Sequence, residues 1–270
     1  MTANALTVLS HFPIGMLGAL EQDFPDVKFL EVPAEGEVPA DVQGDVLLTF
    51  MDGRPNLPAV VEKGVRWIHA IGTGVDAFPL EAVGQRILTC ARGASATPIS
   101  EWTLAMILAF EKQVPEAWVN SAPERWSWRE LGTLEGKTLG LVGLGGIGCA
   151  IATRALAFGM RVRATRRSSA PTPVPGVELV PDLLDLANSA DHLVIAAPAT
   201  KATYHLAGST LLEALGPGAH LINIARGSIV DQDALRMALE DGHVARASLD
   251  VTDPEPLPDG HWLYTHPRVR

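Results

Sequence analysis

Short apolar runs alternate with amphipathic stretches along the chain. In residues 1–97 the runs at 6–9, 27–32, 45–50, 65–71 and 86–89 are typical of β-strands, because Gly, Pro and Asp cluster where they end. Two stretches between them, 14–22 and 59–63, are expected to be helical. The pattern predicts a first α/β domain over residues 1–97, built on an open parallel sheet.

The same alternation resumes after a long predicted helix. A hydroxyl at the N-cap and a proline at the first helical position predict that this helix opens at Thr97-Pro98, and it extends to about Gln113. It is apolar on most sides, which is typical of a buried hinge or of a subunit contact. Further strands are expected at 138–142, 160–168, 192–196, 220–225 and 245–251, and helices at 149–158, 181–187, 209–215 and 232–240. Residues 98–270 are therefore a second domain, and the predicted fold class is α/β with two doubly wound parallel-sheet domains.

Three tryptophans, Trp118, Trp126 and Trp128, lie in a loop-like stretch between the long helix and the second sheet. Pro115 and Pro123 in the same stretch disfavour regular structure. Aromatic side chains in such a loop are consistent with an interface and equally with packing between domains, and both interpretations stay open.

Composition and charge exclude several classes of function. The formal net charge of −10 argues against a general nucleic-acid or anionic-membrane surface. No apolar stretch approaches the length of a membrane span, and the N-terminus lacks the basic and apolar regions of a secretory leader. The two cysteines, Cys90 and Cys149, give neither a disulfide framework nor a metal-ligand spacing. We therefore expect a cytoplasmic protein without a metal site.

A glycine motif marks the start of the second sheet. The apolar run Thr138–Val142 meets the sequence GLGGIG, and the Ala-rich helical segment 149–158 follows directly. In such a strand, turn and helix, Gly143 permits the tight turn, Gly145 lets the backbone approach a pyrophosphate, and Gly148 allows close packing of helix on strand. The segment predicts a dinucleotide pocket at a helix N-terminus.

The next strand indicates which dinucleotide is bound. NAD enzymes place an acidic residue near its end for the ribose 2′-hydroxyl, whereas this chain has Arg166, Arg167 and Ser168 there. Two guanidinium groups and a hydroxyl are donors suited to a 2′-phosphate, so NADPH is the expected cofactor. With Arg161 and Arg163 they make a local basic spot, and the alternative interpretation is a solvated basic patch in a surface loop.

Other strand ends carry candidate chemistry. The turn Gly72–Asp76 follows the strand at 65–71, and its backbone N–H groups could face a ligand, although such a segment is often only a turn. Arg226 follows the strand at 220–225, and Glu255 follows the strand at 245–251. An arginine and a carboxylate would thus border the cofactor cleft, unless Arg226 serves only to pair with an acidic neighbour such as Asp231.

These motifs together resemble the D-isomer-specific 2-hydroxyacid dehydrogenases. The resemblance rests on GLGGIG, PATKAT, INIARGSIVDQDAL and LDVTDPEPLP, at residues 143–148, 198–203, 222–235 and 249–258. Weaker matches, GTGVD at 72–76 and ISEWTLAMIL at 99–108, extend it into the first domain. The sequence TRRS at 165–168 is similar to the NADPH-using glyoxylate and hydroxypyruvate reductase branch. The resemblance implies a flavodoxin-like substrate domain, a Rossmann dinucleotide-binding domain and a homodimer.

The resemblance also implies a role for each site residue. Arg226 matches the arginine that binds the carboxylate and carbonyl of a small 2-keto acid, and Thr73 and Gly74 match the backbone donors to that carboxylate. Glu255 matches the glutamate that pairs with a catalytic histidine and raises its pKa, so that the imidazolium can protonate the nascent alkoxide. Asp250 matches the carboxylate that holds the nicotinamide amide. The implied cofactor contacts are Gly143, Gly145, Gly146, Ile147, Gly148, Arg166, Arg167, Ser168, Pro198, Thr203, Ala225 and Asp250.

The family's catalytic histidine is expected beyond Arg270, together with the C-terminal segment that returns to the first domain. His261 and His266 are expected to be solvent-side histidines without a catalytic role. Two hypotheses follow. The first is an NADPH-dependent reductase of a small 2-keto acid such as glyoxylate or hydroxypyruvate, which forms the D-2-hydroxy acid and whose chain continues past Arg270. The second is a catalytically silent, NAD(P)-binding regulatory module.

Overall fold

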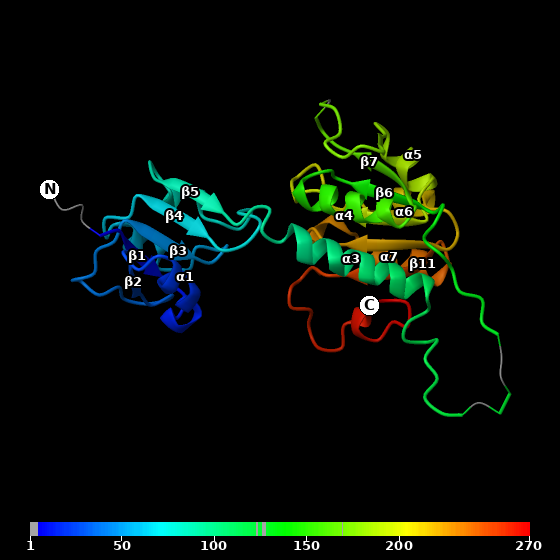
Figure 1. Cartoon of the computed structure of the whole chain (residues 1–270), viewed down its shortest axis with the longest axis horizontal. Helices are drawn as coiled ribbons and strands as arrows, with labels where there is room; N and C mark the ends of the chain where they lie inside the picture. The colour runs from blue at the N-terminus through cyan, green and yellow to red at the C-terminus, as the bar shows by residue number, and fades with distance from the viewer. Residues whose placement is uncertain (1–4, 123, 126–127, 169) are drawn as a thin grey trace. The chain divides into compact units, whose positions relative to one another are not determined.

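All strand pairs formed by the described residues are parallel, and the strands belong to two separate sheets. This computed structural model describes residues 5–122, 124–125, 128–168 and 170–270. The chain divides into unit 1, residues 1–95, and unit 2, residues 96–270, each with one of the sheets (Figure 1). The predicted class of two doubly wound α/β domains is confirmed.

Unit 1 contains a five-stranded sheet in the order β2-β1-β3-β4-β5, which is the flavodoxin-like order. Its core is a single cluster of buried apolar side chains, among them Leu9, Leu47, Leu57 and Ile68. The elements are β1 (Thr7–Ser10), η1 (Ile14–Met16), α1 (Gly18–Asp23), β2 (Lys28–Glu31), β3 (Val46–Thr49), α2 (Leu57–Val61), β4 (Trp67–Ala70), η2 (Leu80–Ala82) and β5 (Ile87–Cys90).

Unit 2 contains a six-stranded sheet in the order β11-β10-β9-β6-β7-β8, which is the Rossmann order with its halves meeting between β6 and β9. Its strands are β6 (Thr138–Val142), β7 (Arg161–Thr165), β8 (Val177–Leu179), β9 (His192–Ile195), β10 (Ala219–Asn223) and β11 (Val244–Leu249). Its helices are α3 (Ala96–Glu111), α4 (Gly146–Ala157), α5 (Leu183–Asn188), α6 (Ser209–Ala214), η3 (Gly227–Ile229), α7 (Gln232–Glu240) and η4 (Trp262–Tyr264).

Two apolar cores cover the two faces of the second sheet. Successive residues of a strand point to opposite faces, so Leu193 and Ile195 of β9 join one core and Val194 joins the other. Helices α5, α6 and α7 contribute to the first core, and α3 and α4 to the second. All residues of β6, β9 and β10 are buried. The continuous apolar runs in the sequence reflect this double burial.

The structure corrects several predicted boundaries. Helix α3 begins at Ala96, so Thr97 is not its N-cap and Pro98 lies inside the first turn. Proline is tolerated there because the first four helical N–H groups have no partner within the helix. Helix α4 begins at Gly146 and not at 149, β8 was not predicted, and the stretch 14–22 is divided between η1 and α1.

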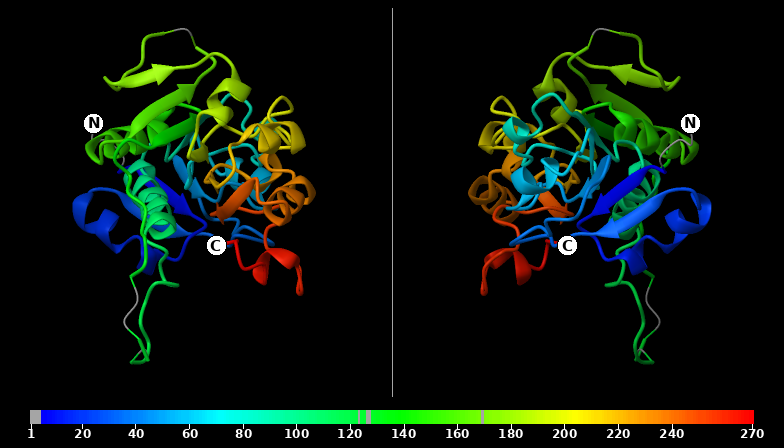
Figure 2. Two further views of the ribbon diagram at one scale, coloured as in Figure 1. Left: turned by 90° about the vertical axis from the view of Figure 1, so that its right-hand side faces the viewer. Right: turned by 90° about the vertical axis from the view of Figure 1, so that its left-hand side faces the viewer.

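The segment that follows α3 extends away from the rest of unit 2 in both views of Figure 2. Trp118 and Trp128 are exposed in it, Trp128 by 95%. Packing within unit 2 therefore does not bury these two side chains. Trp126 and Pro123 lie outside the described residues. No helix in the described ranges has the length and apolar character needed to cross a bilayer.

Candidate functional site

The glycine loop lies where the strand order of unit 2 reverses, between β6 and β9. Gly143 follows β6 with a φ of 105°, which a residue with a side chain rarely adopts. A Cβ on Gly143 would lie 2.9 Å from backbone atoms of Ala196 and Ala197, which follow β9. The two loops therefore touch through their backbones, at the point where doubly wound sheets bind ligands.

The other glycines of the loop divide between packing and open space. A Cβ on Gly148 would lie 2.4 Å from the carbonyl oxygen of Gly143, so this position holds helix α4 against the loop. At Gly145 and Gly146 a Cβ would meet no atom within 4 Å. Ile147 instead packs against the core shared with α3. The N-terminus of α4 is thus free for a phosphate to approach its N–H groups, and the loop fits a dinucleotide.

The basic residues after β7 lie next to this loop. Arg166 is half-buried, and its Nη1 donates a hydrogen bond to the carbonyl oxygen of Pro171 at 3.2 Å. Burial raises the pKa of the Cys149 thiol, in the first turn of α4, and the positive charge of Arg166 opposes that rise. The guanidinium is therefore near the N-terminal turn of the helix. Arg167 and Ser168 are exposed, and the Ser168 hydroxyl accepts a hydrogen bond from the backbone N–H of Ala170 at 3.2 Å.

The basic spot is smaller than the sequence indicated. The Nη2 of Arg163 lies 3.0 Å from the Glu178 carboxylate and 3.3 Å from that of Asp185. Its charge is neutralised within the sheet and its neighbouring helix, and Glu178 is the main cause of a raised Arg163 pKa. Arg161 is exposed at the opposite end of the same strand. Arg166 and Arg167 are the two arginines left at the strand end that faces the glycine loop.

The loop after β9 brings Pro198 and Thr203 together. The Thr203 hydroxyl donates to the carbonyl oxygen of Pro198 at 2.8 Å, and the backbone N–H of Thr200 donates to the same hydroxyl at 2.8 Å. The side chain thus folds the loop on itself. Since Ala196 and Ala197 touch Gly143, this loop lies next to the glycine loop.

Arg226 lies in the loop after β10, which is held from two sides. Its Nη1 donates to the carbonyl oxygen of Ala225 at 2.8 Å, and Asn223 forms hydrogen bonds with the backbone of both residues. A Cβ on Gly227 would lie only 1.9 Å from the carbonyl carbon of Thr252, after β11. The loops that carry Arg226 and Glu255 are therefore in direct backbone contact.

Asp250 and Glu255 lie close to each other after β11. Desolvation, and then repulsion by the Glu255 carboxylate, raise the pKa of Asp250. The backbone N–H of Thr252 donates to Glu255 at 3.5 Å. Among the described residues Glu255 forms no ion pair, and it is exposed, so its carboxylate is available to an imidazole. His261 and His266 are half-buried, and each accepts a hydrogen bond from the backbone two residues later.

In unit 1 the predicted substrate residues follow β4. Gly72 has a φ of 149°, and a Cβ there would collide with Met51, which follows β3, at 2.2 Å from its Sδ. The carbonyl oxygen of Thr73 accepts a hydrogen bond from the Cys90 thiol at 3.7 Å. Within the described part of unit 1, the N–H groups of Thr73 and Gly74 donate no hydrogen bond. They suit an acceptor such as a carboxylate.

No motif marks His11, which follows β1 and is 4% exposed. Its Nδ1 lies 2.7 Å from the hydroxyl of Thr49, at the end of β3, while its buried Nε2 has no partner in the described chain. Burial, and then the charge of Arg54, lower the pKa of His11 to about 4, so the ring is neutral. It lies between β1 and β3, where the strand order of unit 1 reverses.

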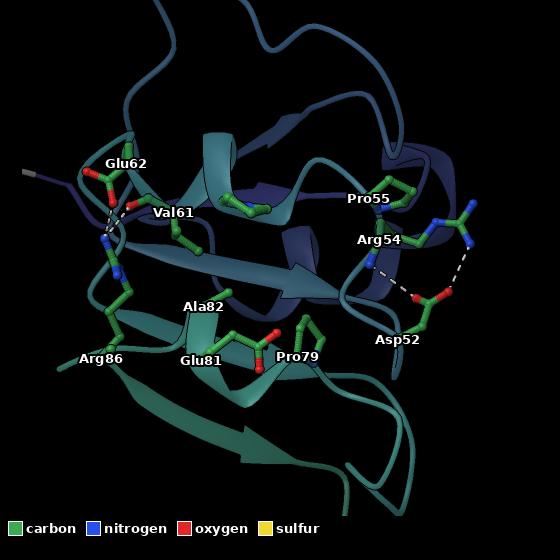
Figure 3. A pocket seen from close by; sticks show the side chains of 11 residues that line it. Asp52, Arg54, Pro55, Val61, Glu62, Pro79, Glu81, Ala82 and Arg86 are labelled. Carbon is green, nitrogen blue, oxygen red and sulfur yellow. Dashed lines mark hydrogen bonds and ion pairs between the residues drawn. The ribbon is translucent and has the colours of Figure 1, made fainter.

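A cavity of about 660 Å³ lies between α2 and η2 of unit 1 (Figure 3). Pro55, Pro58 and Pro79 line it, and ion pairs of Arg54 with Asp52 and of Arg86 with Glu62 border it. None of the predicted site residues lines this cavity. Both arginines are neutralised by carboxylates, so the cavity has no free positive charge for an acidic substrate.

A buried polar network joins the end of α3 to three strands of the second sheet. The Glu111 carboxylate, at the end of α3, lies 2.9 Å from Nζ of Lys137 and 3.1 Å from Nε2 of His192. The rings of His192 and His220 approach to 3.3 Å, and His220 contacts the Ser248 hydroxyl at 2.9 Å. Burial lowers the pKa of His220 well below 6.5. The network ties α3 to β9, β10 and β11 and is separate from the glycine loop.

No group of three or more His, Cys, Asp or Glu side chains in the described ranges is arranged to hold a metal ion.

Comparison with known proteins places the chain among similar sequences. The family model described as D-isomer specific 2-hydroxyacid dehydrogenase, NAD binding domain, matches residues 104–270. D-3-phosphoglycerate dehydrogenase of Methanocaldococcus jannaschii is 32% identical over 255 residues, which are 88% of this chain and 48% of that protein. Glyoxylate reductase of Thermofilum pendens is 37% identical over 223 residues, 79% of this chain and 63% of that protein. The chain thus spans about half to two thirds of the length of these relatives.

Solved structures agree in fold. A D-isomer specific 2-hydroxyacid dehydrogenase from Xanthobacter autotrophicus, in complex with NADPH and MES, superposes with a TM-score of 0.84 at 28% identity, covering 99% of this chain and 87% of that one. The holo form of D-mandelate dehydrogenase from Rhodotorula graminis gives a TM-score of 0.81 at 25% identity, with the same coverage. The similarity extends over both units.

Proposed function

The chain belongs to the D-isomer specific 2-hydroxyacid dehydrogenase family, and from this premise we propose that it is an NADPH-dependent reductase of a small 2-keto acid. The product is the D-2-hydroxy acid, and glyoxylate and hydroxypyruvate are the proposed substrates. In this proposal unit 1 is the substrate domain and unit 2 binds the dinucleotide. The observation that carries the proposal is the position of Arg226, Asp250 and Glu255. They follow the carboxyl ends of their strands, on the same side of the sheet as the glycine loop.

The proposed cofactor residues fit a phosphorylated dinucleotide. Gly145 and Gly146 leave the N-terminus of α4 open to a pyrophosphate, and Arg166 lies near that turn. Arg166, Arg167 and Ser168 offer donors to a 2′-phosphate. Asp250 accepts a hydrogen bond from the nicotinamide amide. When bound, the reduced nicotinamide supplies the hydride.

The chain's own residues bind and polarise the keto acid. The Arg226 guanidinium binds the carboxylate and the keto oxygen, where it stabilises the negative charge that develops as the carbonyl carbon is reduced. In unit 1, the N–H groups of Thr73 and Gly74 are proposed donors to a substrate carboxylate. The alkoxide oxygen then takes one proton from a catalytic histidine. Glu255 is proposed to orient the imidazole of that histidine and to favour its protonated form.

The name of one relative, D-3-phosphoglycerate dehydrogenase, supports a second candidate substrate of the same reaction class, a phosphorylated 2-hydroxy acid. A homodimer and a cytoplasmic location stay predictions. Exposed tryptophans beyond α3 support a contact between subunits, because Trp118 and Trp128 are large apolar side chains without cover in unit 2.

The test, on the protein with its natural C-terminus, is oxidation of NADPH with glyoxylate, hydroxypyruvate and pyruvate, and reduction of NADP by D-3-phosphoglycerate. We expect turnover with a short 2-keto acid, and Arg226→Gln is expected to lower kcat/KM about 100-fold, the usual cost of one oxyanion donor. Arg236→Gln is the matched control, because Arg236 is an exposed arginine of α7 that pairs with Glu240 and lies over the ring of Trp262. Tight NADPH binding without turnover of any acid would contradict the reductase and favour a binding module.

A further inference from the structure

The side chain of Asn223, the last residue of β10, forms its hydrogen bonds within the described residues with the loop that carries Arg226. Asn223 is fully buried. Its Oδ1 accepts a hydrogen bond from the backbone N–H of Ala225 at 3.1 Å, and its Nδ2 donates to the carbonyl oxygen of Arg226 at 2.9 Å. The carboxamide therefore bridges two consecutive residues of the loop, in the manner of an Asx turn.

Two further contacts act together with this bridge on the backbone of Arg226 and its neighbour Gly227. The same carbonyl oxygen accepts a hydrogen bond from the N–H of Ile229 at 3.2 Å, so it is fixed from two directions. On the far side, Gly227 lies against the backbone of Thr252 with no room for a Cβ. Loss of the Asn223 bridge would remove one of the two hydrogen bonds to the Arg226 carbonyl oxygen and the hydrogen bond from the Ala225 N–H.

We propose that Asn223 is a positioning residue for Arg226. It fixes the backbone from which the guanidinium reaches the carboxylate and keto oxygen of the substrate, and it touches neither substrate nor cofactor itself. The inference rests on the proposed function of Arg226. Because a misplacement of about 1 Å can lower the rate about 100-fold, loss of the bridge is expected to weaken substrate binding and to lower kcat.

Two variants separate the two bonds of the bridge. Asn223→Ser keeps a hydroxyl that can accept from the Ala225 N–H and loses the donor to Arg226, whereas Asn223→Ala loses both. The matched control is Asn56→Ala in unit 1, another buried asparagine, whose Nδ2 holds a loop by donating to Pro33 at 2.8 Å. All three variants remove a buried side-chain hydrogen bond, but only two of them alter the Arg226 loop.

Three measurements on the full chain distinguish positioning from stability: the affinity for NADPH, the affinity of the NADPH complex for oxamate, and kcat and KM with glyoxylate. Asn223→Ala is expected to weaken oxamate binding and lower kcat/KM by about 100-fold and Asn223→Ser by about 10-fold. NADPH affinity should fall much less than oxamate affinity, because the glycine loop is untouched and Ala225 is the one implied cofactor contact that the bridge holds. Asn56→Ala should lower the melting temperature and leave the other readouts unchanged.

A double-mutant cycle completes the test, with oxamate affinity as the readout. In an Arg226→Gln background, Asn223→Ser should have no further effect, because the group it positions is gone. An additive effect, a loss of NADPH affinity equal to the loss of oxamate affinity, or wild-type oxamate binding by Asn223→Ser and Asn223→Ala would each overturn the inference while leaving the proposed function intact. If wild type neither binds oxamate nor turns over any keto acid, the proposed function itself fails.

Discussion

Replacing Arg166 and Arg167 by alanine is expected to abolish a preference for NADPH over NADH. The reason is local geometry at the end of β7. Arg166 is half-buried, its guanidinium is anchored on the carbonyl oxygen of Pro171 at 3.2 Å, and it lies near the first turn of α4. Arg167 is exposed beside it. These two side chains are the donors that a 2′-phosphate would meet and a 2′-hydroxyl would not need.

The size of the effect follows from how each arginine is held. A charge-assisted hydrogen bond from an anchored group contributes about 2 kcal/mol, and one from an exposed, mobile side chain about 1 kcal/mol. Together they give about 3 kcal/mol, a change of about 150-fold in the ratio of the two dissociation constants. Arg163 adds nothing, because Glu178 and Asp185 already neutralise it.

The assay is fluorescence titration of NADPH and NADH into wild type, the two single variants and the double variant. Affinity for NADH should change little, and affinity for NADPH should fall most in the double variant and become less dependent on salt. Arg161→Ala, an exposed arginine at the other end of the same strand, is the matched control and should leave both affinities unchanged. Equal affinities of wild type for the two cofactors, or a double variant that keeps its NADPH preference, would refute the reasoning.

Two further predictions concern stability. Gly227→Ala places a Cβ 1.9 Å from the backbone of Thr252, which cannot yield as a flexible side chain would, so unfolding free energy should fall by about 2 to 3 kcal/mol in a urea titration; an unchanged midpoint would contradict the contact. Burial tends to raise the pKa of Glu111, but the close contacts of its carboxylate with His192 and Lys137 outweigh it and hold the pKa below 4.5. The ionised carboxylate therefore stabilises the fold above pH 4.5, and this contribution is lost as the pH falls through the lowered value. Glu111→Gln should cost about 2 kcal/mol at pH 7 and much less at acid pH; a cost independent of pH would show that the charge is not what stabilises.

The secondary structure could be predicted largely because this fold buries its strands on both sides. Strands such as β6 and β9 then appear as uninterrupted apolar runs between turn residues, which are easy to locate. Helix ends were predicted less well. Pro98 indicated a start two residues too late, since proline is accepted at several positions of a first turn. β8 has only three residues, Val177–Leu179, which is too short for an apolar pattern to be recognised.

The candidate site could be predicted as far as topology determines it. In a parallel sheet the carboxyl ends of all strands lie on the same side. Once their strands were located, Arg226 and Glu255 were therefore expected on the same side as the glycine loop. What topology does not determine is how neighbouring loops pack. The bridge from Asn223 was missed, although an asparagine at the end of a strand is a recognisable signal for an Asx turn. His11 had no signal in the sequence, because the contact of its Nδ1 is with Thr49, far away in sequence, and its buried Nε2 has no partner among the described residues.

The glycines show most clearly where inference from a motif ends. The sequence associates the glycines of a nucleotide loop with the ligand, yet Gly143 is required because the backbone after β9 touches it, and Gly227, outside the motif, is required for the same reason by the backbone after β11. Within the glycine loop, only Gly145 and Gly146 face open space. A glycine at a strand end therefore has two distinct causes, contact between adjacent loops and access for a ligand. Because the loops after β6 and β9, and those after β10 and β11, are locked pairwise by such contacts, the polar groups on them keep fixed positions, which is what a site that binds a small, rigid acid requires.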